Sequence, residues 1–248
     1  MGSKKPKVIF KINLYRDAWN YYCAANSNPK WGYDFSKIIK PEIVKKVRRK
    51  KWEKTRNYLY KMLRKGYSID KKKMNSNLKS IKSSWKKVEE KYFQKLEKIT
   101  KKKIYTNKFH CYITTIGRCP YNQKENWFMV NIFSNDASTT IAHELMHLQF
   151  YHYFEKEIRK TLNEKQFQDL KEALTILLNM EFKGILKEKD KGYPGHKKLR
   201  NFIEKEWKKR KDFDVLIEKY INYRDILRHP KGCGFLLRSR HSKTQTVP

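Results

Sequence analysis

Residues 141–148, with the sequence IAHELMHL, constrain this chain more than any other stretch. Two histidines and a glutamate stand in an otherwise apolar run, where polar groups without partners are costly to bury. His143 and His147 are four residues apart, so on a helix both rings project from one face, one turn apart. The side chains of residues 134–136, Ser-Asn-Asp, can cap such a helix. We therefore predict a helix over residues 137–153.

This helix would carry the residue types of a zinc site. Two imidazoles one turn apart can share one zinc ion. Glu144 follows the first histidine and is offset around the helix, so it can take a proton from a zinc-bound water without ligating the metal. The pattern is HExxH, which is typical of zinc hydrolases. The alternative is a core helix with two hydrogen-bonded histidines and a surface glutamate, and the apolar surroundings favour the metal site.

A catalytic zinc ion needs a third protein ligand and an open fourth position. The metzincin extension fails, because Phe150 and Tyr153 stand where it needs glycine and histidine. The next predicted helix contains LKEALTILLN at residues 170–179. Glu172 is costly to bury in so apolar a stretch unless it is paired or ligates a metal. The alternative is an ordinary exposed glutamate on a helix with one polar face.

The segments HELMH and KEALT, on consecutive predicted helices, resemble the gluzincin metallopeptidases, the group that contains thermolysin-like enzymes. The resemblance covers roughly residues 126–182. It implies a peptidase with one zinc ion per chain, held by His143, His147 and Glu172, with Glu144 as the general base. The less well placed competitors for the third ligand are Glu155, Glu164, Asp169 and Glu181.

The resemblance also implies how a peptide or protein substrate binds. An extended peptide would pair with the edge strand before the metal helix, and residues 126–133 are in the place of that strand. A downstream histidine or tyrosine would stabilise the oxyanion, and Tyr193 and His196 are the candidates. Alternatively they are a turn tyrosine and a helix-starting histidine. His152, five residues past His147, points off the ligand face, so we expect it to be structural or exposed.

Periodicity predicts an α+β fold, and the resemblance implies that its small twisted sheet is zincin-like and packs on the metal helix. The C-terminal part would be mostly helical, and a pair of basic helices, expected as a helical hairpin, would form an N-terminal arm that can cover the cleft. We expect a subdomain at 1–104, a catalytic core at 105–226 and a tail at 227–248. The predicted strands cover residues 8–15, 108–114 and 126–133, and the further helices cover 41–65, 76–101, 164–182, 196–209 and 212–224.

The charge is extreme, with 59 Lys and Arg against 25 Asp and Glu, a formal net charge of +34. Such an excess attracts acidic partners such as nucleic acid, although compositional drift also supplies lysine.

A group of aromatic residues stands near the basic N-terminal segments. These rings can stack on single-stranded bases or cap a small core, and we favour the core. They are Trp19, Tyr21, Tyr22, Trp31 and Tyr33. If nucleic acid binds, the peptidase would act on proteins bound there.

Several other classes are disfavoured. None of the four cysteines forms a CxxC pair. Neither a signal peptide nor a membrane-spanning stretch is recognisable, so we expect a cytoplasmic protein without a membrane partner. Deformylase-like hydrolases need a cysteine motif that the surroundings of Cys111 and Cys119 do not match. A zinc-containing binding protein without turnover stays open, although the complete HExxH pattern argues against it.

Overall fold

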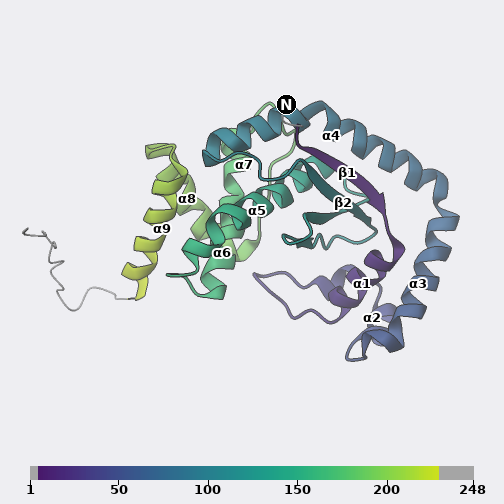
Figure 1. Cartoon of the computed structure of the whole chain (residues 1–248). Coiled ribbons are helices and arrows are strands. Elements are labelled where there is room, and N and C mark those ends of the chain that lie inside the picture. Colours follow the sequence, from purple (N-terminus) through teal and green to yellow (C-terminus); the bar gives the residue numbers. More distant parts are fainter. Residues whose placement is uncertain (1–4, 229–248) are drawn as a thin grey trace, which may run out of the picture.

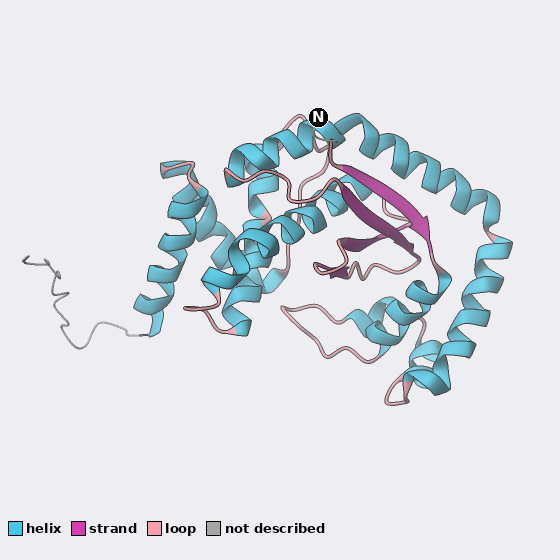
Figure 2. Ribbon diagram, in the orientation of Figure 1, coloured by secondary structure: helices cyan, strands magenta, loops and turns pink. Residues whose placement is uncertain are grey.

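The structure, a computed structural model, describes residues 5–228. It confirms an α+β fold, which is mostly helical with one mixed sheet of four strands (Figure 2). Within the described residues, no helix is both long and apolar enough to span a membrane. The strands are β1 (Lys7–Ile12), β2 (Lys108–Thr114), β3 (Tyr121–Asn122) and β4 (Trp127–Asn131).

The described helices surround this sheet and continue beyond it (Figure 1). Their bounds are α1 (Leu14–Ala25), α2 (Pro41–Val47), α3 (Trp52–Ile69), α4 (Lys71–Thr100), α5 (Ala137–Ile158), α6 (Glu164–Leu174), α7 (Ile176–Glu181), α8 (Lys197–Lys209) and α9 (Phe213–Arg228), with 3-10 helices η1 (Phe35–Ile38) and η2 (Pro194–His196).

The sheet has the strand order β1-β2-β4-β3, with β1, β2 and β4 parallel and β3 antiparallel to β4. Three of the four strands were predicted. β3 was not, because two residues carry no recognisable period. β3 pairs with Trp127 and Phe128, so β4 is an interior strand there. The prediction that residues 126–133 form an open edge strand is therefore wrong over that part.

The main core lies around α5, which packs against α4, α6 and β4. The apolar side chains of α4 face this core, with Trp85 and Tyr92 fully buried. The Tyr92 hydroxyl donates a 2.6 Å hydrogen bond to the carbonyl of Ala142 on α5. α4 therefore supports the helix that carries both histidines. The main core includes residues on both sides of residue 104, where we expected the boundary between the N-terminal subdomain and the catalytic core.

A second, smaller core joins α1, α2 and α3, with Ala18, Val47 and Leu59 at its centre. Buried Asp17 on α1 ties it to the end of β2. Its carboxylate accepts hydrogen bonds from the hydroxyls of Thr114 and Thr115, and burial raises the pKa of Asp17.

Helix α1 was not predicted, because its segment is aromatic and turn-like. The Asn13 side chain nevertheless caps this helix by accepting a hydrogen bond from the backbone N–H of Arg16.

Two predicted helices are broken in the structure. Residues 41–65 form α2 and α3 instead of one helix, because residues 48–51 lie between them with Arg49 at a left-handed φ of 62°. α3 continues into α4 with only Asp70 between them, so both follow one long arch (Figure 1) and the predicted hairpin is wrong. Residues 164–182 divide at Thr175 into α6 and α7. The tail from residue 229 lies outside the described residues.

Candidate metal centre

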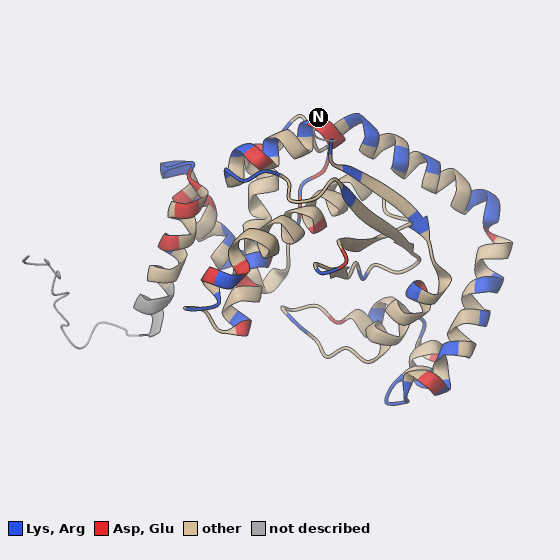
Figure 3. Ribbon diagram, viewed as in Figure 1, with Lys and Arg blue, Asp and Glu red and all other residues tan. Residues whose placement is uncertain are grey.

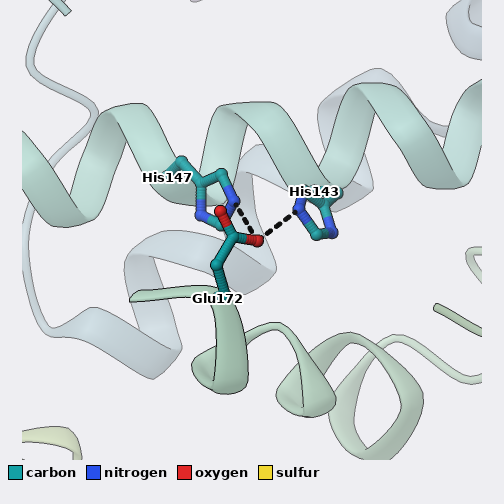
Figure 4. Close-up of side chains that lie close together, drawn as sticks. All are labelled: His143, His147 and Glu172. Atoms are coloured by element: carbon teal, nitrogen blue, oxygen red, sulfur yellow. Dashed lines mark hydrogen bonds and ion pairs between the residues drawn. The ribbon is translucent and has the colours of Figure 1, made fainter. Parts of the chain in front are cut away.

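His143 and His147 on α5 face Glu172 on α6 across the main core (Figure 4). Glu172 Oε2 lies 3.4 Å from His143 Nε2 and 3.2 Å from His147 Nε2. One ligand atom from each residue lies within 4.8 Å of the others. The side chains are 15%, 2% and 7% exposed in the order His143, His147 and Glu172. The three predicted ligands therefore converge on one small, nearly dry space.

Two of the three separations among these atoms suit a tetrahedral zinc site. Two ligand atoms at 2.0–2.2 Å from a tetrahedral ion are about 3.3–3.6 Å apart. The separations of 3.4 and 3.2 Å from Glu172 Oε2 to the two Nε2 atoms are close to that span, and all three ligand atoms lie within 4.8 Å of one another. Two neutral imidazoles and a carboxylate are also a donor set that zinc accepts. The residues present therefore fit a bound zinc ion.

Glu172 is held so that a single oxygen faces the histidines. Its other oxygen, Oε1, accepts a hydrogen bond from the Lys171 ammonium, and the same ammonium donates to the Tyr121 hydroxyl at 2.8 Å. Lys171 is only 2% exposed, so this bond is shielded from water. The arrangement leaves Oε2 facing the two histidines and favours monodentate binding of a metal.

Asp190 fixes the orientation of His143. The His143 Nδ1–H donates to Asp190 Oδ2 at 2.6 Å, which leaves Nε2 as the nitrogen that would ligate a metal once it has lost its proton. Asp190 is itself held by Arg200 Nη1 at 2.8 Å and by the Thr175 hydroxyl at 2.9 Å. Gly192, at a φ of 61°, lets the chain pass Arg200, since a Cβ there would lie 2.5 Å from Nη1.

The charges of these groups influence one another. Burial lowers the pKa of His143, but the ion pair with Asp190 outweighs it and raises that pKa well above its usual value. Burial, together with the Lys171 ammonium, lowers the pKa of His147 to about 3. Burial opposes ionisation of Glu172, but His147 and Lys171 hold its pKa well below the usual value. Metal binding must therefore displace a proton from His143.

Glu144 differs from these residues because its carboxylate has no fixed partner. Within residues 5–228 no group donates a hydrogen bond to it, although Glu144 is only 6% exposed. Burial, followed by the nearby Glu172 carboxylate, outweighs the His143 cation and raises its pKa to about 8. It lines a groove of about 640 Å³ together with His143, Cys119 and Tyr193. The alternative of a surface glutamate is therefore wrong, and a water in the groove can reach this carboxylate.

The two predicted oxyanion residues lie in different places. Tyr193 lines the groove with Glu144, and burial raises the pKa of its hydroxyl, which stays protonated at neutral pH. His196 does not line the groove. Its ring packs 4.9 Å from that of Trp31, and Nε2 lies 3.1 Å from Asp169 Oδ1. The structure brings Tyr193 to the candidate site and does not bring His196 there.

The competing carboxylates are engaged elsewhere. Glu155 and Glu164 pair with Arg159. Glu181 pairs with Lys95 and Lys211. His152 is exposed and stacks on Tyr105 with ring centroids 4.1 Å apart, as expected for a residue off the ligand face. Among the five carboxylates proposed as the third ligand, Glu172 is therefore the one that reaches both histidines.

Sequence reasoning missed Asp190 and Lys171. Asp190 lies in an irregular segment 47 residues from His143, and no spacing rule connects the two. A signal for Lys171 was present, because it stands in the same apolar stretch as Glu172 and a buried ammonium also needs a partner.

Replacement of Asp190 by asparagine is expected to weaken zinc affinity about 10- to 100-fold. Asparagine keeps the size of the side chain but removes the negative charge that orients His143. Competition titration with a zinc-binding dye measures the change, and Asp214→Asn on the exposed start of α9 is the matched control. Unchanged affinity in Asp190→Asn would show that the His143–Asp190 contact does not support metal binding.

Comparison of the chain with models of protein families, with curated proteins and with solved structures finds no match.

Proposed function

We propose that this protein is a zinc-dependent peptidase of the gluzincin type. One observation carries the proposal: His143, His147 and Glu172 direct three donor atoms at one point, next to a buried glutamate that has no partner among the described residues. The resemblance in sequence supports it, because gluzincins take two histidines from one helix and a glutamate from the following helix. We also propose that the sheet and the helix that carries both histidines form a zincin-like core.

Each residue has a distinct role in this mechanism. Zinc, when bound, supplies a Lewis acid that lowers the pKa of water and polarises a carbonyl group. Glu144 accepts the proton of the attacking water and delivers it to the leaving amine. Asp190 keeps the His143 ring in place, and Lys171 keeps the Glu172 carboxylate turned toward the histidines.

Tyr193 is the residue we assign to oxyanion stabilisation. Its hydroxyl is protonated at neutral pH, as that of an ordinary tyrosine is, and burial raises its pKa further, with the carboxylates of Glu172 and Glu144 adding to the effect. A protonated hydroxyl in the groove can donate to the oxygen on which charge develops. His196 has no part in this mechanism, since its Nε2 is engaged with Asp169.

The substrate is a peptide segment that lies in the groove beside Glu144. Besides the residues of the centre, the lining of the groove includes Gly117, Ser134, Asn135 and Asp136. Its volume of about 640 Å³ is within the usual range of ligand pockets and accommodates a few side chains. No residue of α3 or α4 lines it, so the proposed mechanism does not require a basic arm that covers the cleft.

The test is metal-dependent cleavage. Purified protein should contain about one zinc ion per chain, the stoichiometry of a single site. It should cleave an unfolded protein such as casein, lose that activity after removal of the metal by a chelator, and regain it with added zinc. Mass spectrometry of the fragments identifies the bonds. Zinc at one per chain without cleavage of casein or of a peptide library would favour a binding protein, and cleavage unaffected by the chelator would contradict the proposal.

A further inference from the structure

Four aromatic side chains gather at the junction of α1 and α3, and we call Tyr15, Trp19, Tyr22 and Trp52 the aromatic platform. Trp19 and Tyr22 are stacked with centroids 5.3 Å apart and planes at 26°. Trp52 meets Tyr15, Trp19 and Tyr22 edge-on at 5.0–5.4 Å. The Trp52 indole N–H donates to the Tyr15 hydroxyl at 3.1 Å. The rings therefore form one ordered group.

The outer part of the platform contributes little to the core. Tyr22 and Trp52 pack against the second core, whereas Tyr15 is 51% exposed and Trp19 is 45% exposed. The expectation that the N-terminal aromatics cap a core thus holds for Tyr22 and fails for Trp19. Large exposed aromatic side chains beside one another are typical of binding surfaces.

A loop of four consecutive basic residues is fixed against this platform. The loop covers residues 48–51, Arg-Arg-Lys-Lys, between α2 and α3. Arg48 Nε donates to the Ala25 carbonyl at 2.9 Å, and the Arg49 backbone N–H donates to Asn26 Oδ1 at 2.7 Å. The Tyr22 hydroxyl donates to the Lys50 carbonyl at 3.0 Å, which joins the platform directly to the loop.

The cations of the basic loop and of the helices that continue from it are largely unneutralised. Within the described residues, Arg49, Lys50 and Lys51 form no ion pair with a carboxylate. Between residues 45 and 87 the sequence has 18 lysines and arginines and only two acidic residues, Glu53 and Asp70. Figure 3 shows these basic residues along α2, α3 and the first part of α4.

We propose that the aromatic platform and the basic loop bind single-stranded nucleic acid. Bases stack on the exposed rings of Tyr15 and Trp19, while the backbone phosphates contact Arg49, Lys50 and Lys51. Stacking on aromatic rings beside a cationic track is how proteins bind single strands without reading their sequence. The inference does not depend on the metal centre, because no residue of the platform or the loop lines the groove at Glu144.

An anionic membrane is the competing partner for a basic and aromatic surface. Membrane-surface segments insert an amphipathic apolar face that includes aliphatic side chains. Here the exposed side chains on the platform are a tyrosine and a tryptophan, and the exposed face of α3 carries five lysines and arginines. A strand of stacked bases fits these rings better than a bilayer does.

The first experiment measures binding of a fluorescent oligo-dT 20-mer by anisotropy, with the full chain and at several salt concentrations. Trp19→Ala and Tyr15→Ala should each weaken binding about 5- to 150-fold, the range for loss of one stacked base. Phe133→Ala, at an equally exposed ring that is 42% accessible, should leave the affinity unchanged. Because about half of the Trp19 side chain is buried, its replacement could disturb the fold, and circular dichroism verifies that the variant is folded.

The second experiment separates a local contact from general charge. The double variant Lys50→Glu/Lys51→Glu should reduce the slope of log affinity against log salt by about 1.4, since each phosphate contact contributes about 0.7 for a single strand. The double variant Lys205→Glu/Lys219→Glu makes the same change of net charge on α8 and α9, where both lysines are exposed. It should leave the slope unchanged.

Three outcomes would overturn the proposal. The first is equal affinity for the 20-mer in wild type, Trp19→Ala and Tyr15→Ala. The second is an equal loss of slope in the two double variants, which would indicate unspecific attraction. The third is binding to phosphatidylserine vesicles, but not to the 20-mer, that depends on Trp19. None of these readouts involves peptide cleavage or zinc, so failure here is distinguishable from failure of the proposed peptidase.

Discussion

Replacement of Glu144 by glutamine is expected to lower kcat by at least about 10²- to 10⁴-fold, the usual contribution of a general base. Glutamine has nearly the same size but cannot accept a proton from water. The zinc content should remain at the wild-type value, because the carboxylate of Glu144 is not among the converging ligand atoms. Steady-state kinetics on the cleaved peptide, together with elemental analysis for zinc, measure both quantities.

The environment of Glu144 explains why so large an effect is expected. Burial raises its pKa to about 8 in the metal-free chain, which makes it a stronger base than an exposed glutamate. A divalent cation bound nearby would shift that pKa down toward neutrality, where a general base is most effective.

The matched control for this experiment is Glu157→Gln. Glu157 lies on the same helix α5 but is exposed and pairs with Lys160 on the surface. Its replacement should leave kcat and zinc content unchanged. Turnover by Glu144→Gln at the level of this control would exclude Glu144 as the base, even if the zinc site itself is intact.

Replacement of His143 by alanine is expected to reduce the zinc content from about one ion per chain to nearly none, and to abolish cleavage. The substitution removes one of three protein ligands and leaves Asp190 without the ring that it orients. Elemental analysis after dialysis against a weak chelator measures the loss. Glu172→Gln, which keeps the side chain's shape but removes its charge, should also lose zinc.

His152→Ala is the control for this second experiment. His152 is on the same helix but exposed, stacked on Tyr105 away from the ligands, and its replacement should leave the zinc content unchanged. Thermal unfolding adds an independent measurement. Zinc at 100 times its dissociation constant should stabilise the wild-type protein by about 2.7 kcal/mol and should not stabilise His143→Ala. Wild-type zinc content in His143→Ala would refute the metal centre.

Some features of this protein could be predicted because they depend on local periodicity. The spacing of His143 and His147 places both rings on one face of any helix, and the structure has them there. The apolar stripe of α4 faces the main core for the same reason, with Trp85 and Tyr92 fully buried. The burial of Glu172 could be predicted from its apolar neighbours in the sequence, because a folded chain buries such a stretch together with the polar side chain inside it.

Other features depend on where the chain reverses, and short segments do not reveal this. The break of residues 41–65 at Arg49 was not visible, since basic residues are compatible with a helix. The capping of α1 by Asn13 was overlooked among aromatic residues that suggested turns. β3 is too short for a pattern, yet its pairing with β4 decides whether that strand has a free edge.

The amino-acid sequence by itself determined the helix with two histidines and a glutamate, the third carboxylate and the uneven charge. Tertiary structure alone decided that Asp190 reaches His143 across 47 residues, that Lys171 turns Glu172, and that His196 lies apart from the groove that Tyr193 lines. The physical reason is that helical spacing is set within one or two turns of the chain. Hydrogen-bond partners of buried groups are set by the packing of distant segments, which no local period encodes.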